Sequence, residues 1–224
     1  ETQCDHRLMS SMPAASLFVK VVALGDSLTT GFQSYGCFGN TEISTPYTDI
    51  LTDRVRRDFL PSSLVVEIDN RGVIGELTEQ MLARFSFDVI QLSPKIVIIL
   101  GGSNDLGWGL DPGEIFSSLR GMYDLSQKSG IVPVACTVPS ILGFDEGIPP
   151  RKVLNNLIMK HSRKSGLRCV DLFSVLADPD TGRLASQYSA DGLHLSAGGY
   201  RKVGDAIYED GLEPIIRSIV EAHP

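Results

Sequence analysis

Four short stretches of the chain contain side chains that could together perform acyl transfer. Ser27 stands in G-D-S-L (25–28) directly after an apolar run, and Asn104 stands in G-G-S-N-D (101–105) after another. Asp191 and His194 are three residues apart in S-A-D-G-L-H-L-S (189–196). In a turn, Asp191 could accept from one imidazole N–H and fix its tautomer, while the other ring nitrogen takes the proton of Ser27. The amide of Asn104 could then donate to a tetrahedral oxyanion.

Each of these motifs also has an ordinary structural explanation. A Gly-Asp-Ser turn closes many strands because Asp and Ser are common turn formers. By itself, Asn104 fits a turn residue, and His194 fits a partly buried histidine with satisfied hydrogen bonds. Their joint occurrence favours the acyl-transfer interpretation, since a nucleophile, a base, an orienting acid and an oxyanion donor are all supplied.

A glycine-containing stretch, N-R-G-V-I-G-E-L-T (70–78), precedes an expected helix. Gly72 and Gly75 permit backbone conformations that other residues resist, and the N–H of Gly75 could point into a site. A phosphate-binding loop is the alternative, but the chain lacks G-x-x-x-x-G-K-S/T, and it lacks G-x-G-x-x-G after its first strand.

The remaining histidines and the cysteines suggest no further site. His6, His161 and His223 each lack an acid three residues before them, the spacing of Asp191 before His194. The four cysteines have no C-x-x-C spacing, so neither a zinc or redox motif nor a disulfide framework is indicated. The cysteines are Cys4, Cys37, Cys136 and Cys169.

Short apolar runs alternate with amphipathic segments along the chain. Runs of this kind are typical of strands covered on both faces, and they occupy residues 17–24, 64–68, 96–100, 131–137 and 167–172. The alternation predicts a three-layer α/β/α domain whose site lies beyond the carboxyl ends of its strands. Helices are expected after Thr45-Pro46, with an apolar stripe Tyr47, Leu51 and Val55; after Asp111-Pro112, with Ile115, Leu119 and Met122; after Pro149-Pro150, with Val153, Leu157 and Ile158; after Ser196; and over 76–85.

Composition limits the remaining possibilities. A length of 224 residues without an evident linker predicts one domain over 17–224, with 1–16 as an extension or cloning remnant. The net charge of −7 argues against nucleic acid as a partner. No apolar run reaches the roughly 18 residues that a membrane span needs. The start of the chain lacks a signal-peptide layout, and with unpaired cysteines this favours a cytoplasmic location.

Taken together, these motifs resemble the blocks of the GDSL, or SGNH, hydrolase family between Val21 and about Gly199. The residues that match are Ser27, Gly75, Asn104 and His194, with Gly72 as a second candidate for the glycine. The resemblance implies an SGNH hydrolase fold, with a flavodoxin-like five-stranded parallel sheet of order 2-1-3-4-5. It implies a Ser27-Asp191-His194 triad and an oxyanion hole made by the Ser27 N–H, the Gly75 N–H and the Asn104 side chain. It also implies hydrolysis of esters or thioesters without metal or cofactor.

The sequence defines the substrate less closely than it defines the type of reaction. The segment 139–150 is apolar and loop-like, which predicts a substrate-binding loop that moves, or else a loop packed on the core. We expect a small-molecule acyl ester with a short- to medium-length chain, as for a carboxylesterase or lipase. Thioesterase, lysophospholipase, carbohydrate acetylesterase and acyltransferase activities are alternatives. The candidate substrate-binding residues are Trp108, Ile141, Leu142 and Phe144.

An alternative from another class is a non-catalytic, flavodoxin-like binding module. In that case Ser27, Thr29 and Thr30 would hold a flavin phosphate after the first strand. This interpretation assigns no role to Asp191 and His194, so the sequence favours the hydrolase.

Overall fold

The structure, a computed structural model, describes residues 17–33, 43–59 and 64–222. Its main sheet has five parallel strands in the order β4-β1-β5-β6-β7. A separate antiparallel pair is formed by β2 (Phe32–Gln33) and β3 (Ile43–Ser44). The strands of the main sheet are β1 (Leu17–Gly25), β4 (Leu64–Gly72), β5 (Ile96–Leu100), β6 (Val132–Cys136) and β7 (Arg168–Val170).

The α/β class and the flavodoxin-like sheet are confirmed. Because β2 and β3 lie outside the main sheet, its five strands counted along the chain alone have the order 2-1-3-4-5. The labels differ from that sequence of numbers because these two short strands, which the sequence analysis did not predict, occupy two places in the count.

The central strands are buried on both sides, which explains their continuous apolar sequences. In β1, Val21 and Ala23 belong to the core on one face of the sheet, whereas Val22 and Leu24 belong to the core on the other. Consecutive residues of a strand point to opposite faces, so a strand covered twice needs an apolar residue at every position.

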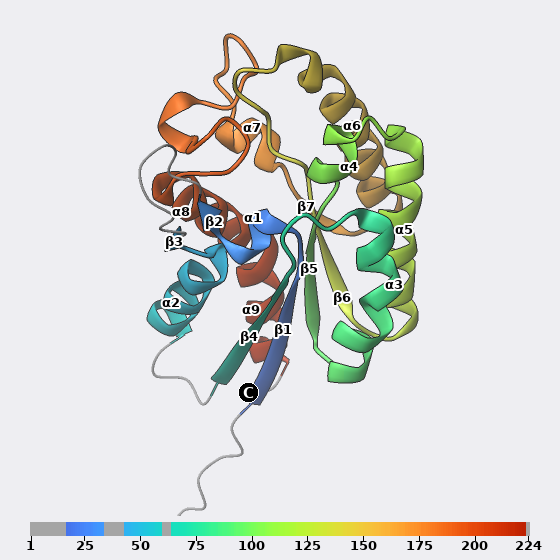
Figure 1. Cartoon of the computed structure of the whole chain (residues 1–224). Coiled ribbons are helices and arrows are strands. Elements are labelled where there is room, and N and C mark those ends of the chain that lie inside the picture. The colour runs from blue at the N-terminus through green and yellow to red at the C-terminus, as the bar shows by residue number, and fades with distance from the viewer. Residues whose placement is uncertain (1–16, 34–42, 60–63, 223–224) are drawn as a thin grey trace, which may run out of the picture.

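Helices cover both faces of the sheet (Figure 1). One layer contains α2 (Tyr47–Phe59), α8 (Ala197–Ala206), the π-helix η4 (Ile207–Leu212) and α9 (Glu213–Glu221). The other contains α3 (Thr78–Asp88), α5 (Pro112–Lys128) and α6 (Ile148–Ser165). The connections include the short elements α1 (Ser27–Thr30), η1 (Ile90–Leu92), α4 (Ser103–Gly107), η2 (Asp145–Gly147), α7 (Leu172–Leu176) and η3 (Ser186–Tyr188).

The helix starts agree with the capping signals at α5 and α8 and depart from the predictions at α3 and α6. Asp111 caps α5 and Ser196 caps α8 through their side-chain oxygens. The helix expected from residue 76 begins instead at Thr78, because the N–H of Thr78 bonds the carboxylate of Asp105. The helix expected after Pro149-Pro150 begins at Ile148, so both prolines lie in its first turn. Val153 was wrongly placed on the apolar face of α6: it is exposed, and Leu154 is buried in its place.

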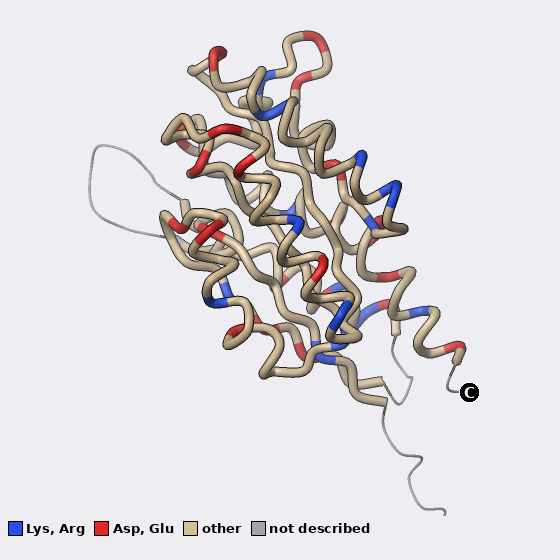
Figure 2. The backbone as a smooth tube through the Cα atoms, turned by 90° about the vertical axis from the view of Figure 1, so that its right-hand side faces the viewer, with Lys and Arg blue, Asp and Glu red and all other residues tan. Residues whose placement is uncertain are grey.

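The helices in the described part of the chain carry charged residues, its cysteines are unpaired, and none of its helices could cross a membrane. Of the helices on the side shown in Figure 2, α3 and α5 contain both basic and acidic residues, whereas the charged residues of α6 are all basic. Cys136 and Cys169 are free thiols, while Cys4 and Cys37 lie outside the described residues. The expected extension at 1–16 also lies outside them. None of the helices in residues 17–33, 43–59 and 64–222 has the length and apolar character to cross a membrane.

Candidate active site

Ser27 is the first residue of α1 and follows directly from the carboxyl end of β1. The turn between them requires Gly25, because a Cβ there would lie 2.4 Å from the carbonyl oxygen of Leu100 and 2.2 Å from Oγ1 of Thr29. The neighbouring strand β5 therefore approaches the end of β1 too closely for any side chain. This contact places Ser27 at the carboxyl edge of the sheet, as the sequence predicted.

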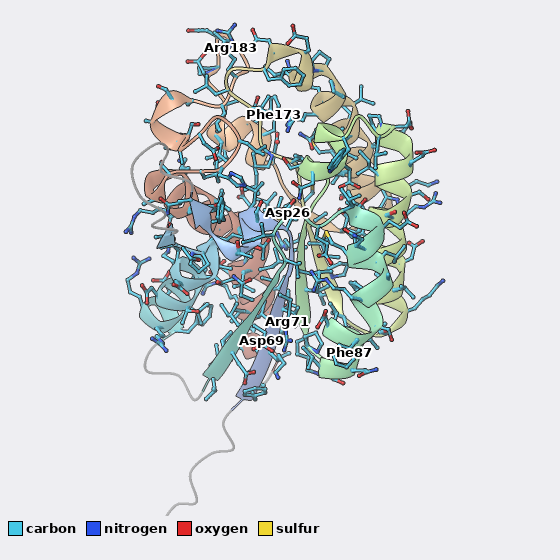
Figure 3. The ribbon with its side chains drawn as sticks, viewed as in Figure 1. Asp26, Asp69, Arg71, Phe87, Phe173 and Arg183 are labelled. Atoms are coloured by element: carbon cyan, nitrogen blue, oxygen red, sulfur yellow. The ribbon has the colours of Figure 1, made fainter. Side chains whose placement is uncertain are left out.

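Asp26 caps α1 from beneath Ser27. Its Oδ1 accepts the N–H of Leu28 at 2.9 Å and so braces the turn. The side chain lies at the centre of the molecule (Figure 3) and has no exposed surface. Burial raises the pKa of Asp26 to about 7, and the nearby carboxylates of Asp105 and Glu76 act in the same direction. Asp26 is thus a carboxyl group that keeps its proton well above the usual range.

The structure brings Ser27, His194 and Asp191 into one hydrogen-bonded chain. Oγ of Ser27 lies 3.1 Å from Nε2 of His194, across 167 positions of sequence. Nδ1 of His194 lies 2.8 Å from Oδ2 of Asp191. These two contacts occupy both ring nitrogens in the order that a nucleophile, a base and an orienting acid require.

Local backbone contacts hold the acid and the histidine together. Oδ1 of Asp191 accepts the backbone N–H groups of His194 at 2.7 Å and of Leu193 at 3.0 Å. Partial burial would raise the pKa of Asp191, but the hydrogen bonds from His194 and Leu193 outweigh it, and the pKa lies below its ordinary value. Asp191 therefore remains an anion facing the imidazole at neutral pH.

Phe32 is a neighbour of the site that the sequence did not reveal. Its ring packs edge-on against the imidazole of His194, with ring centroids 4.8 Å apart and planes at 70°. The carbonyl oxygen of Phe32 accepts the hydroxyl of Tyr200 at 2.7 Å, which ties β2 to α8. A single aromatic residue after G-D-S-L-T-T-G has no distinguishing pattern, so only the fold identifies this contact.

The glycine-containing stretch 70–78, called the glycine loop below, and Asn104 come together at the ends of β4 and β5. Nδ2 of Asn104 donates to the carbonyl oxygen of Glu76 at 2.9 Å, directly after Gly75. Gly75 has a φ of 78°, a conformation that favours glycine, and no described residue accepts its N–H. Asp105 accepts the N–H and the hydroxyl of Thr78 and so holds the start of α3 beside Asn104.

Gly72, the second candidate for the family's glycine, is occupied differently. It ends β4, and its N–H donates to Oδ1 of Asn70 at 2.9 Å. A Cβ at this position would lie 2.6 Å from the backbone nitrogen of Thr30. Gly72 therefore allows β4 to pack against α1, and its N–H is not available to a ligand, whereas the N–H of Gly75 is.

The four candidate substrate-binding residues lie in two connections. Trp108 follows α4 and is 78% exposed, and Phe144 is 55% exposed. Ile141 and Leu142 are half-buried. Leu142 also borders a hollow of about 400 Å³ whose lining does not include the Ser27 side chain. The residues lining this hollow are Leu142, Gly143, Asp145, Glu146 and Arg183.

The segment after β6 is bonded to the loop that contains Asp191 and His194. The N–H of Leu142 donates to the carbonyl oxygen of Gly192 at 2.8 Å, and Gly192 has a φ of 99°. The carbonyl oxygen of Ile141 accepts the N–H of Leu184 at 3.1 Å. Of the two alternatives for this segment, these bonds support the packed loop.

His161 lies outside the hydrogen-bonded chain of Ser27, His194 and Asp191. His161 lies on α6 and packs against Phe116 and Tyr123, away from any acid of the site. His6 and His223 lie outside the described residues. Among the residues that the structure describes, no group of three or more His, Cys, Asp or Glu side chains could hold a metal ion.

A parallel α/β sheet with a Ser-His-Asp chain at its carboxyl edge is typical of the α/β serine hydrolases. The model of the GDSL-like Lipase/Acylhydrolase family matches residues 23–202 of this chain. The chain therefore belongs to the GDSL-like lipase/acylhydrolase family.

Individual relatives agree with this assignment. An arylesterase from Vibrio mimicus is 31% identical over 126 residues, which are 55% of this chain and 58% of that protein. The chain thus matches less than two thirds of the length of this curated relative. Among solved structures, the lipase/acylhydrolase of Enterococcus faecalis is similar with a TM-score of 0.71 and 24% identity, over 88% of this chain and 96% of that one. A variant of an acetyl xylan esterase from Geobacillus stearothermophilus has a TM-score of 0.70 and 20% identity, over 88% and 97%. The two solved structures share the fold.

Proposed function

We propose that the protein is a serine ester hydrolase that works through an acyl-enzyme on Ser27. The observation that supports this best is the continuous contact from Oγ of Ser27 to Nε2 of His194 at 3.1 Å, and from Nδ1 to Asp191 at 2.8 Å. Acyl transfer needs a hydroxyl, a base that accepts its proton and an anion that orients the base. The proposal takes residues 17–224 as one domain with this single site.

The reaction has two halves on the same side chains. Oγ of Ser27 attacks the ester carbonyl carbon while Nε2 of His194 takes the hydroxyl proton. The tetrahedral adduct then collapses, and the imidazolium gives that proton to the departing alcohol. Water next attacks the acyl-enzyme, and His194 takes a proton from it and returns one to Ser27 as the acid leaves. Asp191 remains ionised throughout and stabilises the imidazolium.

The oxyanion of both adducts would be held by the N–H groups of Ser27 and Gly75 and by the amide of Asn104. An amide nitrogen has two protons, and in Asn104 one of them is given to the carbonyl oxygen of Glu76. The second is available to the oxyanion. A donor of this kind contributes about 3–4 kcal/mol to the transition state.

For the substrate, we propose short- to medium-chain acyl esters. The similarity to an arylesterase from Vibrio mimicus supports esters with an aromatic alcohol. The exposed ring of Trp108, one residue beyond α4, supports apolar contact with the ester beside Asn104. Thioesters and acetylated sugars are the alternative substrates, and the test below compares them directly.

The test is hydrolysis of nitrophenyl esters from acetyl to palmitoyl, with Ser27→Ala as the matched control. We expect a rate that depends on Ser27 and peaks at one chain length. An acyl thioester and a peracetylated sugar measured beside them would reveal a preference for either alternative. Unchanged ester hydrolysis by folded Ser27→Ala protein would refute the nucleophile. A yellow protein without hydrolytic activity would instead favour the flavin-binding module.

A further inference from the structure

Arg84, on the inner side of α3, joins three segments of the candidate site. Its Nε and Nη2 bond the two carboxylate oxygens of Glu76 at 2.7 and 2.6 Å. Nη2 also lies 2.8 Å from the carbonyl oxygen of Arg71 at the end of β4, and 3.3 Å from that of Gly25 at the end of β1. The guanidinium thus contacts the end of β1, just before Ser27, and two residues of the glycine loop, Arg71 before Gly75 and Glu76 after it.

Both partners of this ion pair are largely shielded from water. The side chains of Arg84 and Glu76 are 18% and 7% exposed. Asp88, one turn further along α3, accepts Nη1 of Arg84 at 3.0 Å and fixes the third nitrogen of the group. A bidentate pair in which all three nitrogens are engaged determines the orientation of the carboxylate as well as its distance.

Glu76 connects this guanidinium to the oxyanion donors. Its side chain is held by Arg84, while its own carbonyl oxygen accepts Nδ2 of Asn104 at 2.9 Å. The residue before it is Gly75, whose N–H is the other proposed donor from outside α1. A rotation of the Glu76 backbone would therefore displace both donors together. Glu76 thus contacts the guanidinium through its side chain and Asn104 through its carbonyl oxygen.

We propose that Arg84 is a positioning residue for the oxyanion hole, which acts through Glu76 to orient the Gly75 N–H and the Asn104 amide. This inference rests on the proposed function. Arg84 does not contact the reacting atoms, so its loss should leave substrate binding nearly unchanged. It should lower kcat, because the two donors are aligned with the oxyanion only while Glu76 is clamped.

The experiment compares Arg84→Met, Arg84→Lys and Arg54→Met for hydrolysis of the best nitrophenyl ester. For Arg84→Met we expect a fall in kcat of about 10- to 100-fold with KM changed less than about threefold. Arg84→Lys should have nearly the same lowered kcat as Arg84→Met, since an ammonium cannot bind both carboxylate oxygens in one plane. Arg54 is the matched control: its side chain is 19% exposed and pairs with Asp205, remote from the site, so its variant should keep wild-type kcat.

A double-mutant comparison separates positioning from a general structural role. Because Arg84 acts through both the Asn104 amide and the Gly75 N–H, Arg84→Met should cost at least about threefold less in kcat when Asn104 is already alanine than in the wild type, and the Gly75 N–H accounts for the cost that remains. The same 10- to 100-fold loss in both backgrounds would overturn the proposal. So would a parallel loss in Arg54→Met and Arg84→Met, because any broken ion pair would then have the effect.

Two further results keep this test decisive. If Arg84→Met does not fold, Glu76→Gln takes its place, because it keeps the backbone acceptor of Asn104 but loses the charged pair. We expect a fall in its kcat of about 5- to 10-fold, and an unchanged kcat would overturn the inference. Failure of the proposed function would look different, since Ser27→Ala would then retain activity whatever the Arg84 variants do.

Discussion

Replacement of Asp26 by asparagine tests whether a neutral carboxyl group lies beneath the nucleophile. Asp26 is completely buried, its Oδ1 accepts the N–H of Leu28, and its Oδ2 has no partner among the described residues. Burial raises its pKa from 3.8 to about 7, and Asp105 and Glu76 contribute in the same direction. Asparagine has the same shape and keeps the acceptor for Leu28, but it cannot ionise.

The sign and size of the effect follow from these two pKa values. Between about pH 4 and pH 7, the folded protein keeps the proton of Asp26 and the unfolded chain has released it. The folded state therefore binds more protons, and the free energy of unfolding falls as pH rises, by about 1.4 kcal/mol per pH unit. From pH 5 to pH 7 this amounts to about 2 kcal/mol, because the slope has fallen by half at pH 7, and it approaches about 3 kcal/mol by pH 8, where the loss levels off.

The assay is urea unfolding of the wild type and of Asp26→Asn at pH 5 and pH 8. The stability of the variant relative to the wild type should increase by about 3 kcal/mol between the two pH values. Asp145→Asn is the control, because the exposed carboxylate of Asp145 is paired with Arg183 and its pKa lies below the ordinary value. Its relative stability should not change over this range. An equal difference at both pH values for Asp26→Asn would refute the neutral carboxyl group.

Four other substitutions test the oxyanion hole, the triad, the turn and the core in turn. Asn104→Ala should lower kcat for a nitrophenyl ester by about 10²- to 10³-fold with little change in KM, since the donor acts on the oxyanion and not on the bound ester. Asp191→Asn should lower kcat by about 10⁴-fold in the same assay, because an amide can favour the wrong tautomer of His194. Gly25→Ala should lower stability by about 3 kcal/mol in urea unfolding, because its Cβ would lie 2.4 Å from the carbonyl oxygen of Leu100. Phe85→Ala should cost about 3–5 kcal/mol in the same measurement, since the ring is fully buried, but should leave the kcat of the folded fraction unchanged.

Each of these expectations has a clear contrary result. A wild-type kcat in Asn104→Ala or Asp191→Asn would exclude that side chain from the reaction. Wild-type stability in Gly25→Ala would mean that the ends of β1 and β5 lie further apart than described. A loss of kcat in folded Phe85→Ala protein would mean that the core beneath α3 also determines the geometry of the site.

The strands were predictable because burial on both faces leaves a continuous apolar sequence. Val21, Val22, Ala23 and Leu24 show no alternation, and all four are buried. The Asp191–His194 pair was predictable for a different reason: the two residues are neighbours in sequence, and a turn with that spacing brings their side chains together. The capping residues of α5 and α8 act on the next few backbone amides and are local in the same way.

Contacts between distant segments could not be predicted from local patterns. Arg84 has no sequence feature that distinguishes it from an exposed arginine on an amphipathic helix, yet it bonds the ends of β1 and β4. Val153 was misplaced because a shift of one residue along a helix turns the side chain by about 100°, from the core toward solvent. Phe32 meets His194 only because β2 and the loop before α8 lie side by side.

The sequence by itself determined the class of the fold, the parallel sheet and the types of side chain at its carboxyl edge. These depend on short-range patterns, namely apolar runs, capping residues and motifs within a few positions. Tertiary structure alone decided that Oγ of Ser27 meets Nε2 of His194 and that Asn104 is anchored to Glu76. It also decided that, among the described residues, Gly72 has an acceptor for its N–H and Gly75 has none. Each of these outcomes depends on how closely separate strands and loops approach, and packing across the whole sheet sets those distances.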